Sequence, residues 1–245
     1  MKASEKTLEL NVSENLLQDI RDLYPNAFLQ GFTLHHEAIN GLDVSISVPN
    51  VQIGLGLQFK RPTSQRNGIY KFSINNNRKH DQHVILYELV ELFTLLLGRQ
   101  PPFYYAFPTI LDDTEVLQAT PNFYARTYLV SPLDIPFHII DGNIHHVEID
   151  TRHNEITVHS ESSKIVNFFT ADKLISKYRN PRKKIQEVKE KLDPIHVGKL
   201  RELIHNKQKK QILESVYTKN TDKEIVLTKL FKGNWHIDMH GIMLP

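Results

Sequence analysis

The chain has 245 residues, enough to bury one large core with or without a smaller appendage. Its apolar content of 40% and charged content of 24% are ordinary for a globular domain. There is no cysteine, which excludes disulfides, thiolate nucleophiles and cysteine-based zinc sites. No run of about 18 apolar residues occurs, and residues 1–6 lack the apolar core of a signal peptide. We therefore expect a cytoplasmic protein that has no membrane partner.

The net charge of +2 conceals an uneven distribution of charge along the chain. Residues 173–233 carry 17 Lys and Arg against 7 Asp and Glu, so this segment has a net charge of +10 and the remainder −8. A basic C-terminal third on an acidic body indicates a polyanion partner, and a solvated lysine-rich helical face explains the same pattern. Charge alone leaves both interpretations open.

The first sixty residues predict a helix followed by a hairpin. Residues 5–24 form a helix, or a strand followed by a helix with Ser13 as its N-cap. Residues 27–40 form a short helix or an extended segment that ends in a turn at Asn40-Gly41. Alternating apolar residues then predict two antiparallel strands at 44–48 and 53–59, joined by a turn at Pro49-Asn50.

The next fifty residues contain the strongest helical pattern in the chain. A polar loop is expected at 61–68 and a third strand at 69–74. Apolar residues at helical spacing over 81–97 predict the main core helix, and the apolar run 103–107 predicts a buried strand. This segment should therefore supply much of the core.

The remaining residues predict a small antiparallel sheet and then helices. Thr114 is a candidate N-cap for a helix at 115–119, and His153-Asn154 is a candidate turn. The expected strands are 125–130, 145–149 and 155–159, and the expected helices are 171–178, 182–191 and 197–215. We expect an α/β protein with a core at 1–110, a β-rich extension of the same domain at 111–170, and a basic, mainly helical region at 171–245.

The polar residues of the predicted hairpin suggest a metal-dependent phosphodiesterase centre. Asp43 opens the first strand, and Gln58 and Lys60 share one face of the second, because side chains repeat every second residue. A turn near residues 49–50 brings residue 43 opposite roughly residue 57 ± 2. Oxygen donors of this kind hold hard cations, and a lysine can stabilise charge on phosphoryl oxygens. Gly54 and Gly56, on the same face, leave room for an approach to the backbone.

Residues 15–110 resemble the PD-(D/E)XK, or restriction-endonuclease-like, nuclease superfamily. The matching positions are Glu37 before the hairpin, Gly41-Leu42-Asp43 at the first strand, and Gln58-Phe59-Lys60 on the second. The predicted helix at 81–97 and the strand at 103–107 extend the match. The chain is similar to subfamilies in which Gln-x-Lys replaces Asp/Glu-x-Lys.

The resemblance implies a restriction-endonuclease-like mixed sheet flanked by helices, and an endonuclease that uses Mg²⁺ or Mn²⁺. Glu37, Asp43 and Gln58 would hold the metal, and Lys60 would position or activate the water. The substrate would be nucleic acid, with DNA favoured, in restriction or anti-phage defence. A catalytically inactive nucleic-acid-binding module and an assembly subunit of a defence system are the alternatives. A second copy of the chain or a defence-system protein would be the protein partner.

Nucleic-acid contacts are predicted from two further groups of residues. By the resemblance, Gln82 and His83 at the start of the 81–97 helix would face the active site, whereas the residues alone fit an N-cap segment around Asp81. Basic side chains are the natural phosphate contacts. The candidates are Arg61, Arg179, Arg182, Lys183 and Lys184.

The 13 histidines do not predict a dedicated metal site. None shows His-x-x-x-His spacing beside a catalytic Glu on a helix. His145 and His146 would point to opposite faces of a strand, so one metal cannot easily bind both.

Overall fold

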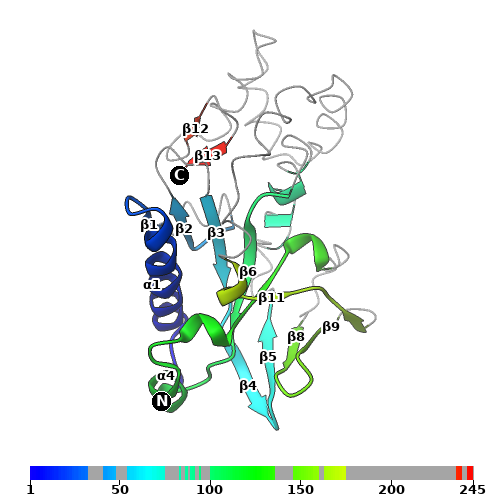
Figure 1. Ribbon diagram of the computed structural model, residues 1–245. Coiled ribbons are helices and arrows are strands. Elements are labelled where there is room, and N and C mark those ends of the chain that lie inside the picture. Colours follow the sequence, from blue (N-terminus) through cyan, green and yellow to red (C-terminus); the bar gives the residue numbers. More distant parts are fainter. Residues whose placement is uncertain are drawn as a thin grey trace.

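The computed structural model describes the six main segments 1–32, 41–47, 54–74, 100–135, 146–159 and 163–174. It also describes residues 83, 86–87, 89–91, 94, 236–238 and 242–244. This part of the chain is α/β, with one six-stranded mixed sheet, one five-stranded and one two-stranded antiparallel sheet, and few helices (Figure 1). The helices predicted at 182–191 and 197–215, and most of that at 171–178, lie outside the described residues.

The N-terminal segment forms one continuous helix, α1 (Glu5–Leu23). Ser4 is its N-cap, because the Ser4 side chain accepts a hydrogen bond from the N–H of Thr7 at 2.9 Å. The prediction of Ser13 as an N-cap is wrong: Ser13 lies inside the helix and is buried. The apolar stripe explains the difference, since it continues unbroken on both sides of that position. The stripe consists of Leu8, Val12, Leu16, Leu17 and Ile20.

The mixed sheet has six strands in the order β1-β2-β3-β6-β7-β11. These are β1 (Phe28–Gly31), β2 (Val44–Ser47), β3 (Gly54–Phe59), β6 (Phe103–Pro108), β7 (Thr127–Val130) and β11 (Phe169–Thr170). β3 and β6 are parallel and every other pair is antiparallel. The predicted hairpin is confirmed, with Val44 opposite Leu57, and so is the buried strand at β6.

The antiparallel sheet has five strands in the order β10-β9-β8-β5-β4. These are β10 (Ser163–Ile165), β9 (Glu155–His159), β8 (His146–Asp150), β5 (Ile69–Ser73) and β4 (Pro62–Arg66). The predictions of strands at β5, β8 and β9 are confirmed. The prediction of a loop at 61–68 is wrong. Asn67 and Gly68 make a two-residue turn with positive φ, and the polar, exposed residues before it form the edge strand β4.

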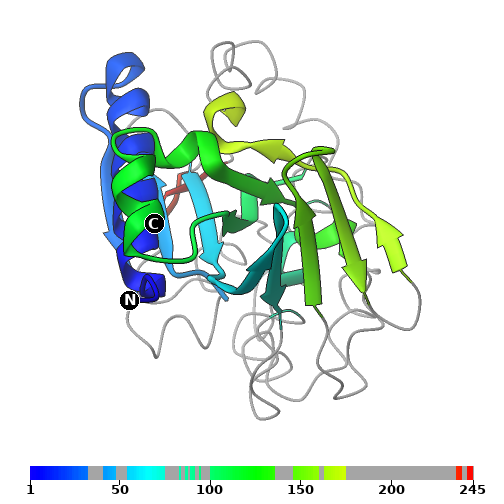
Figure 2. The same ribbon diagram turned by 90° about the horizontal axis from the view of Figure 1, so that it is seen from below.

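The two faces of the mixed sheet contact different layers. One face packs against α1 through Val44, Ile46, Leu55, Leu57 and other residues of the first core. The other face, which includes Phe103, Tyr105 and Phe107, packs against Phe72, Val147 and other residues of the five-stranded sheet. In Figure 2, α1 (dark blue) lies on one side of the mixed sheet, and β8 and β9 (yellow-green) lie on the other. Because successive side chains of a strand point to opposite faces of the sheet, each side chain packs into one of the two cores.

Short helices and one further strand pair complete the described part. Helix α4 (Asp113–Ala119) begins after Asp112, whose side chain accepts the N–H of Glu115, so the expectation of Thr114 as its cap is wrong. Three 3₁₀ turns follow, η1 (Phe123–Arg126), η2 (Pro132–Asp134) and η4 (Ala171–Lys173), and the first occupies the start of the strand predicted at 125–130. The described residues between 83 and 94 are helical, as predicted. Strands β12 (His236–Asp238) and β13 (Ile242–Leu244) pair with each other.

None of the helices in the described segments has the length and apolar character that crossing a bilayer requires.

Candidate functional site

The structure brings Asp43 and Gln58 together at the start of the β2–β3 pair. Asp43 directly precedes β2, and its backbone N–H donates to the carbonyl of Leu57 at 2.9 Å. The Gln58 side-chain Nε2 lies 2.9 Å from each carboxylate oxygen of Asp43. Both residues are buried, with 8% of Asp43 and 1% of Gln58 exposed. The two side chains therefore share one side of the sheet, within hydrogen-bonding distance.

The backbone of β3 holds the Asp43 carboxylate in place. The N–H of Phe59 donates to Asp43 Oδ2 at 2.6 Å. The carboxylate thus gives the buried main-chain N–H of Phe59 a hydrogen-bond acceptor, between the predicted site residues Gln58 and Lys60. This contact gives Asp43 a structural role in addition to any chemical one.

Three oxygen atoms surround the Gln58 amide nitrogen. They are the two carboxylate oxygens of Asp43 and the main-chain carbonyl of Phe59, which lies 3.4 Å from Nε2. Gln58 Oε1 is buried and makes no hydrogen bond with any residue in the described part of the chain. A reversed amide would instead present this oxygen to the same point. Carboxylate, amide and carbonyl oxygens are the donors that Mg²⁺ prefers, so the residues fit a hard divalent cation.

Lys60 and Arg61 follow β3 directly. Lys60 is half-buried, and its backbone N–H donates to the carbonyl of Ala106 at 3.0 Å. Arg61 is exposed, and its N–H donates to the Glu5 carboxylate at 3.1 Å. The backbone at this end of β3 is thus tied both to β6 and to α1.

His83 lies on the same side of the mixed sheet as Gln58. Its Nδ1 is 3.1 Å from the hydroxyl of Tyr105, and Tyr105 pairs with Gln58 in the parallel register of β3 and β6. The His83 side chain is fully buried. A phosphate contact through His83 would therefore require this part of the protein to open.

The remaining predicted site residues lie outside the described residues. They are Glu37, Gln82, Arg179, Arg182, Lys183 and Lys184. Of the four proposed catalytic residues, the structure thus describes three and shows two in direct contact.

The expectation that Gly56 leaves room for a ligand is wrong. A Cβ atom at Gly56 would lie 2.6 Å from Phe103 Cδ1 and 2.7 Å from Leu42 Cδ1. The space over this glycine is filled by two side chains of the second core. Gly56 therefore serves close packing within the sheet.

A second polar cluster, His146, Glu148 and His159, was not predicted from the sequence. His146 and His159 are directly opposite each other on β8 and β9, and Glu148 is two residues along from His146. A partial signal was present in the predicted strands 145–149 and 155–159, which as a hairpin bring residues near 146 opposite residues near 159. The turn over residues 151–154 sets the register that pairs 146 with 159, and these two histidines are too far apart in sequence to form a short motif.

The sequence matches no family model, and comparisons with curated proteins and with solved structures give no match.

Proposed function

We propose that this protein is a metal-dependent nuclease that hydrolyses phosphodiester bonds in nucleic acid, with DNA as the favoured substrate. One observation carries the proposal: Asp43 Oδ1, Asp43 Oδ2 and the carbonyl oxygen of Phe59 converge on the amide of Gln58. Lys60 follows Gln58 by two residues, the spacing that places side chains on one face of a strand. The buried oxygen atoms are hard donors of the kind that bind a divalent cation.

The order of the elements supports a restriction-endonuclease-like core. Helix α1 is followed by β1, β2 and β3, which pair antiparallel, then by β4 and β5 of the other sheet, then by helical residues between 83 and 94, and then by β6, which is parallel to β3. A hairpin, a tyrosine-containing strand, a helix and a further strand in this order are what the resemblance of residues 15–110 implies. The proposed catalytic residues lie at neighbouring ends of β2 and β3, where two adjacent strands can present side chains to one substrate.

Each residue has a defined task in this proposal. Asp43, the carbonyl of Phe59 and the amide oxygen of Gln58 would hold Mg²⁺ or Mn²⁺, with Glu37 as a further ligand. The bound cation would polarise the phosphate and lower the pKa of a bound water molecule. Lys60 would offset the charge that develops on the phosphoryl oxygens and orient the attacking water. The basic residues of the C-terminal third would bind the phosphate backbone.

A specific observation favours the alternative, a catalytically inactive nucleic-acid-binding module or assembly subunit. Both oxygens of Asp43 already accept hydrogen bonds, from the Gln58 amide and from the Phe59 N–H. Gln58 also carries no negative charge, so this site should bind a cation less tightly than a site with two carboxylates would. The Asp43 carboxylate is thus satisfied without a metal.

Cleavage assays with Mg²⁺ or Mn²⁺ on duplex DNA, single-stranded DNA and RNA test the proposal. Asp43→Ala and Lys60→Ala should each lower the cleavage rate by about 100-fold or more, since each removes a metal ligand or a charge-stabilising group. Arg66→Ala, on the exposed edge strand β4, is the control and should cleave like wild type. Equal cleavage by all four proteins would refute the catalytic assignment.

The variant Gln58→Glu separates the proposal from its alternative. An added carboxylate should lower the Mg²⁺ concentration needed for half-maximal cleavage. A wild-type protein that binds DNA but does not cleave it, together with a Gln58→Glu variant that does, would assign the natural protein to the inactive class.

A further inference from the structure

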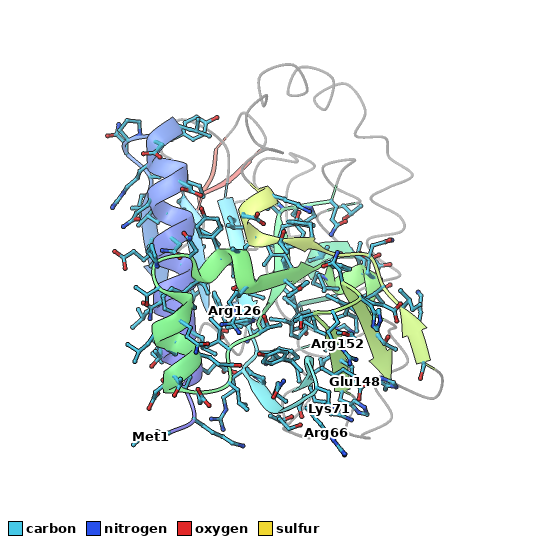
Figure 3. All side chains as sticks on the ribbon, turned by 60° about the horizontal axis from the view of Figure 1, so that its bottom comes forward. Met1, Arg66, Lys71, Arg126, Glu148 and Arg152 are labelled. Carbon is cyan, nitrogen blue, oxygen red and sulfur yellow. The ribbon has the colours of Figure 1, made fainter. Side chains whose placement is uncertain are left out.

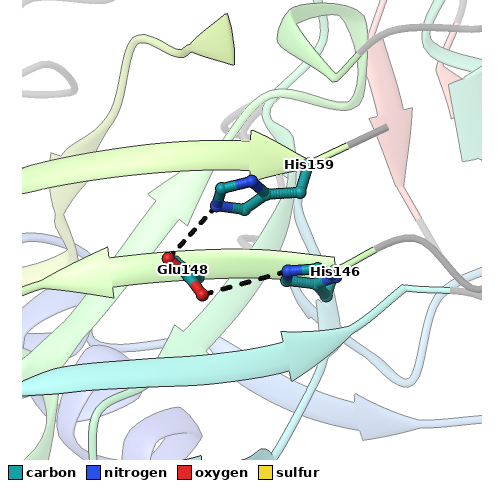
Figure 4. Close-up of side chains that lie close together, drawn as sticks. All are labelled: His146, Glu148 and His159. Atoms are coloured by element: carbon teal, nitrogen blue, oxygen red, sulfur yellow. Dashed lines mark ion pairs between the residues drawn. The ribbon is translucent and has the colours of Figure 1, made fainter. Parts of the chain in front are cut away.

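The geometry points to a second metal site, for a zinc-class ion, formed by His146, Glu148 and His159 on the five-stranded sheet. His146 Nε2 lies 3.9 Å from Glu148 Oε1, and His159 Nε2 lies 3.1 Å from Glu148 Oε2 (Figure 4). One ligand atom from each residue lies within 4.8 Å of the other two. The site is independent of the proposed nuclease centre, because none of its residues belongs to β2 or β3.

The β8–β9 hairpin preorganises these three side chains. His146 pairs with His159 across the strands, and Glu148 follows His146 by two residues, so all three project from one face of the sheet. The two imidazole rings stack with their centroids 4.6 Å apart and an interplanar angle of 18°. Asp150 closes the hairpin by accepting the N–H of Arg152 at 2.9 Å. A rigid hairpin holds potential ligands at short separations without a metal having to assemble them.

The hydrogen bonding of His159 directs its second ring nitrogen toward Glu148. Its Nδ1 is 2.9 Å from the hydroxyl of Ser163 on β10. Its Nε2 is buried and makes no well-aligned hydrogen bond with any described residue, although a carboxylate oxygen lies 3.1 Å away. In the tautomer whose Nδ1–H donates a hydrogen bond to the Ser163 hydroxyl, the Nε2 lone pair faces an anionic oxygen, and a cation between these two atoms would stabilise that arrangement. Metal-bound histidines are commonly oriented in this way through their second nitrogen.

The Glu148 carboxylate belongs to an outward-facing position of β8, where a solvated ion can reach it.

Two imidazole nitrogens and one carboxylate are a ligand set typical of zinc rather than magnesium. With metal–ligand distances of about 2.0–2.1 Å, a tetrahedral ion separates its ligand atoms by about 3.3 Å. The distances of 3.9 Å from His146 Nε2 to Glu148 Oε1 and of 3.1 Å from His159 Nε2 to Glu148 Oε2 lie on either side of this value, each measured to a different carboxylate oxygen. Three protein ligands would leave the fourth position to water.

Lys71 on β5 competes for the same carboxylate. Its Nζ lies 2.5 Å from Glu148 Oε1, and the two residues are opposite each other in the β5–β8 register (Figure 3). The Lys71 side chain is half-exposed, and an ammonium group can donate hydrogen bonds but cannot form coordinate bonds to imidazole nitrogens. A zinc-class ion can engage all three groups and displace it.

Calorimetric titration of the metal-stripped, full-length protein with Zn²⁺ tests the site. We expect about one equivalent of binding that His159→Ala weakens by about 100-fold or more. His153→Ala is the matched control, because His153 lies on the same hairpin but contacts Asp150. Retained affinity in His159→Ala, with the fold verified by circular dichroism, would overturn the proposal.

Lys71→Ala separates a metal site from a simple ion-pair network. In a metal site, removal of the competing cation should tighten Zn²⁺ binding and increase the rise in melting temperature that Zn²⁺ produces. If neither the wild type nor Lys71→Ala binds Zn²⁺, the cluster is only an ion-pair network that connects β5, β8 and β9, and the proposal is overturned. Asp43→Ala should bind Zn²⁺ like wild type, so failure here and failure of the nuclease proposal remain distinguishable.

Discussion

Only glycine fits at position 56, because the neighbouring side chains leave no space for a Cβ atom. A Cβ atom there would meet Phe103 and Leu42, both fully buried and both part of the second core. Neither neighbour can move outward into solvent. Gly56 was expected to leave space for a ligand. It is instead a point of close contact between β3 and the side chains of Phe103 and Leu42.

Gly56→Ala should lower the free energy of unfolding by about 1–3 kcal/mol, because the added methyl group overpacks the core. Gly31→Ala is the matched control, since nothing lies within 4 Å of a Cβ at that glycine. Its effect should stay within about 0.5 kcal/mol. Urea unfolding at neutral pH measures both, and equal stabilities of the two variants would contradict the packing argument.

Tyr70, Glu115 and Arg126 connect three elements, namely β5, α4 and η1. The Tyr70 hydroxyl donates to Glu115 Oε1 at 2.7 Å, and Arg126 Nη2 lies 3.3 Å from the Tyr70 oxygen. The second Glu115 oxygen accepts the N–H of Leu111 at 2.5 Å. Burial, followed by the hydrogen bond to and charge of Glu115, raises the pKa of Tyr70 to about 12, despite the opposing effect of Arg126. The network therefore couples the docking of α4 to a phenol that must stay protonated.

The network predicts a specific loss of stability at high pH. The folded protein retains the Tyr70 proton between about pH 10 and pH 12, where the unfolded chain releases it. The stabilisation is complete below pH 10 and is lost as the pH rises through 12. Tyr70→Phe should abolish this part of the pH dependence and cost about 1 kcal/mol at neutral pH.

Urea unfolding between pH 8 and pH 12 measures the effect. Glu115→Gln should shift the loss of stability to lower pH, because it removes the carboxylate that raises the pKa of Tyr70. Identical pH profiles for wild type and both variants would exclude a role for the network.

At the scale of the whole molecule, segments distant in sequence complete each sheet. β7 and β11 join the mixed sheet beyond β6, while β8, β9 and β10 join the sheet begun by β4 and β5. One buried cluster lies between the two sheets. The strands of 111–170 therefore share their cores with the strands of 1–110.

The proposed binding of nucleic acid gives a prediction that depends on the distribution of charge over the whole molecule. The triple variant Arg182→Ala, Lys183→Ala, Lys184→Ala should weaken DNA binding and reduce the slope of log affinity against log salt by about 3, since each lost phosphate contact contributes about 0.9. Fluorescence anisotropy between about 50 and 200 mM salt measures this slope.

A matched triple variant of Lys2, Arg66 and Lys164 to Ala removes the same charge from exposed positions of the body. Its slope should stay close to that of wild type. An equal loss in both variants would attribute binding to net charge rather than to the basic segment.

The sequence by itself determined the periodic features of this protein. Alternating residues identified β2, β3 and β5, and the helical spacing in the first 24 residues identified the helix there, because burial of one face imposes a repeat that can be read along the chain. A continuous apolar run identified β6, and strand patterns predicted β8 and β9. The same periodicity brought Asp43 and Gln58 into one hypothesis before their contact was visible. Local polar signals were less informative: Ser13 and Thr114 resembled caps, and the edge strand β4 resembled a loop.

Only the tertiary structure decided which residues meet across strands and between layers. The cluster of His146, Glu148 and His159 depends on a hairpin register, and the filling of the space over Gly56 depends on side chains from two other segments. The hydrogen bonds that occupy both Asp43 oxygens likewise depend on the exact juxtaposition of β2 and β3. Such contacts join residues far apart in the chain, so no local repeat encodes them.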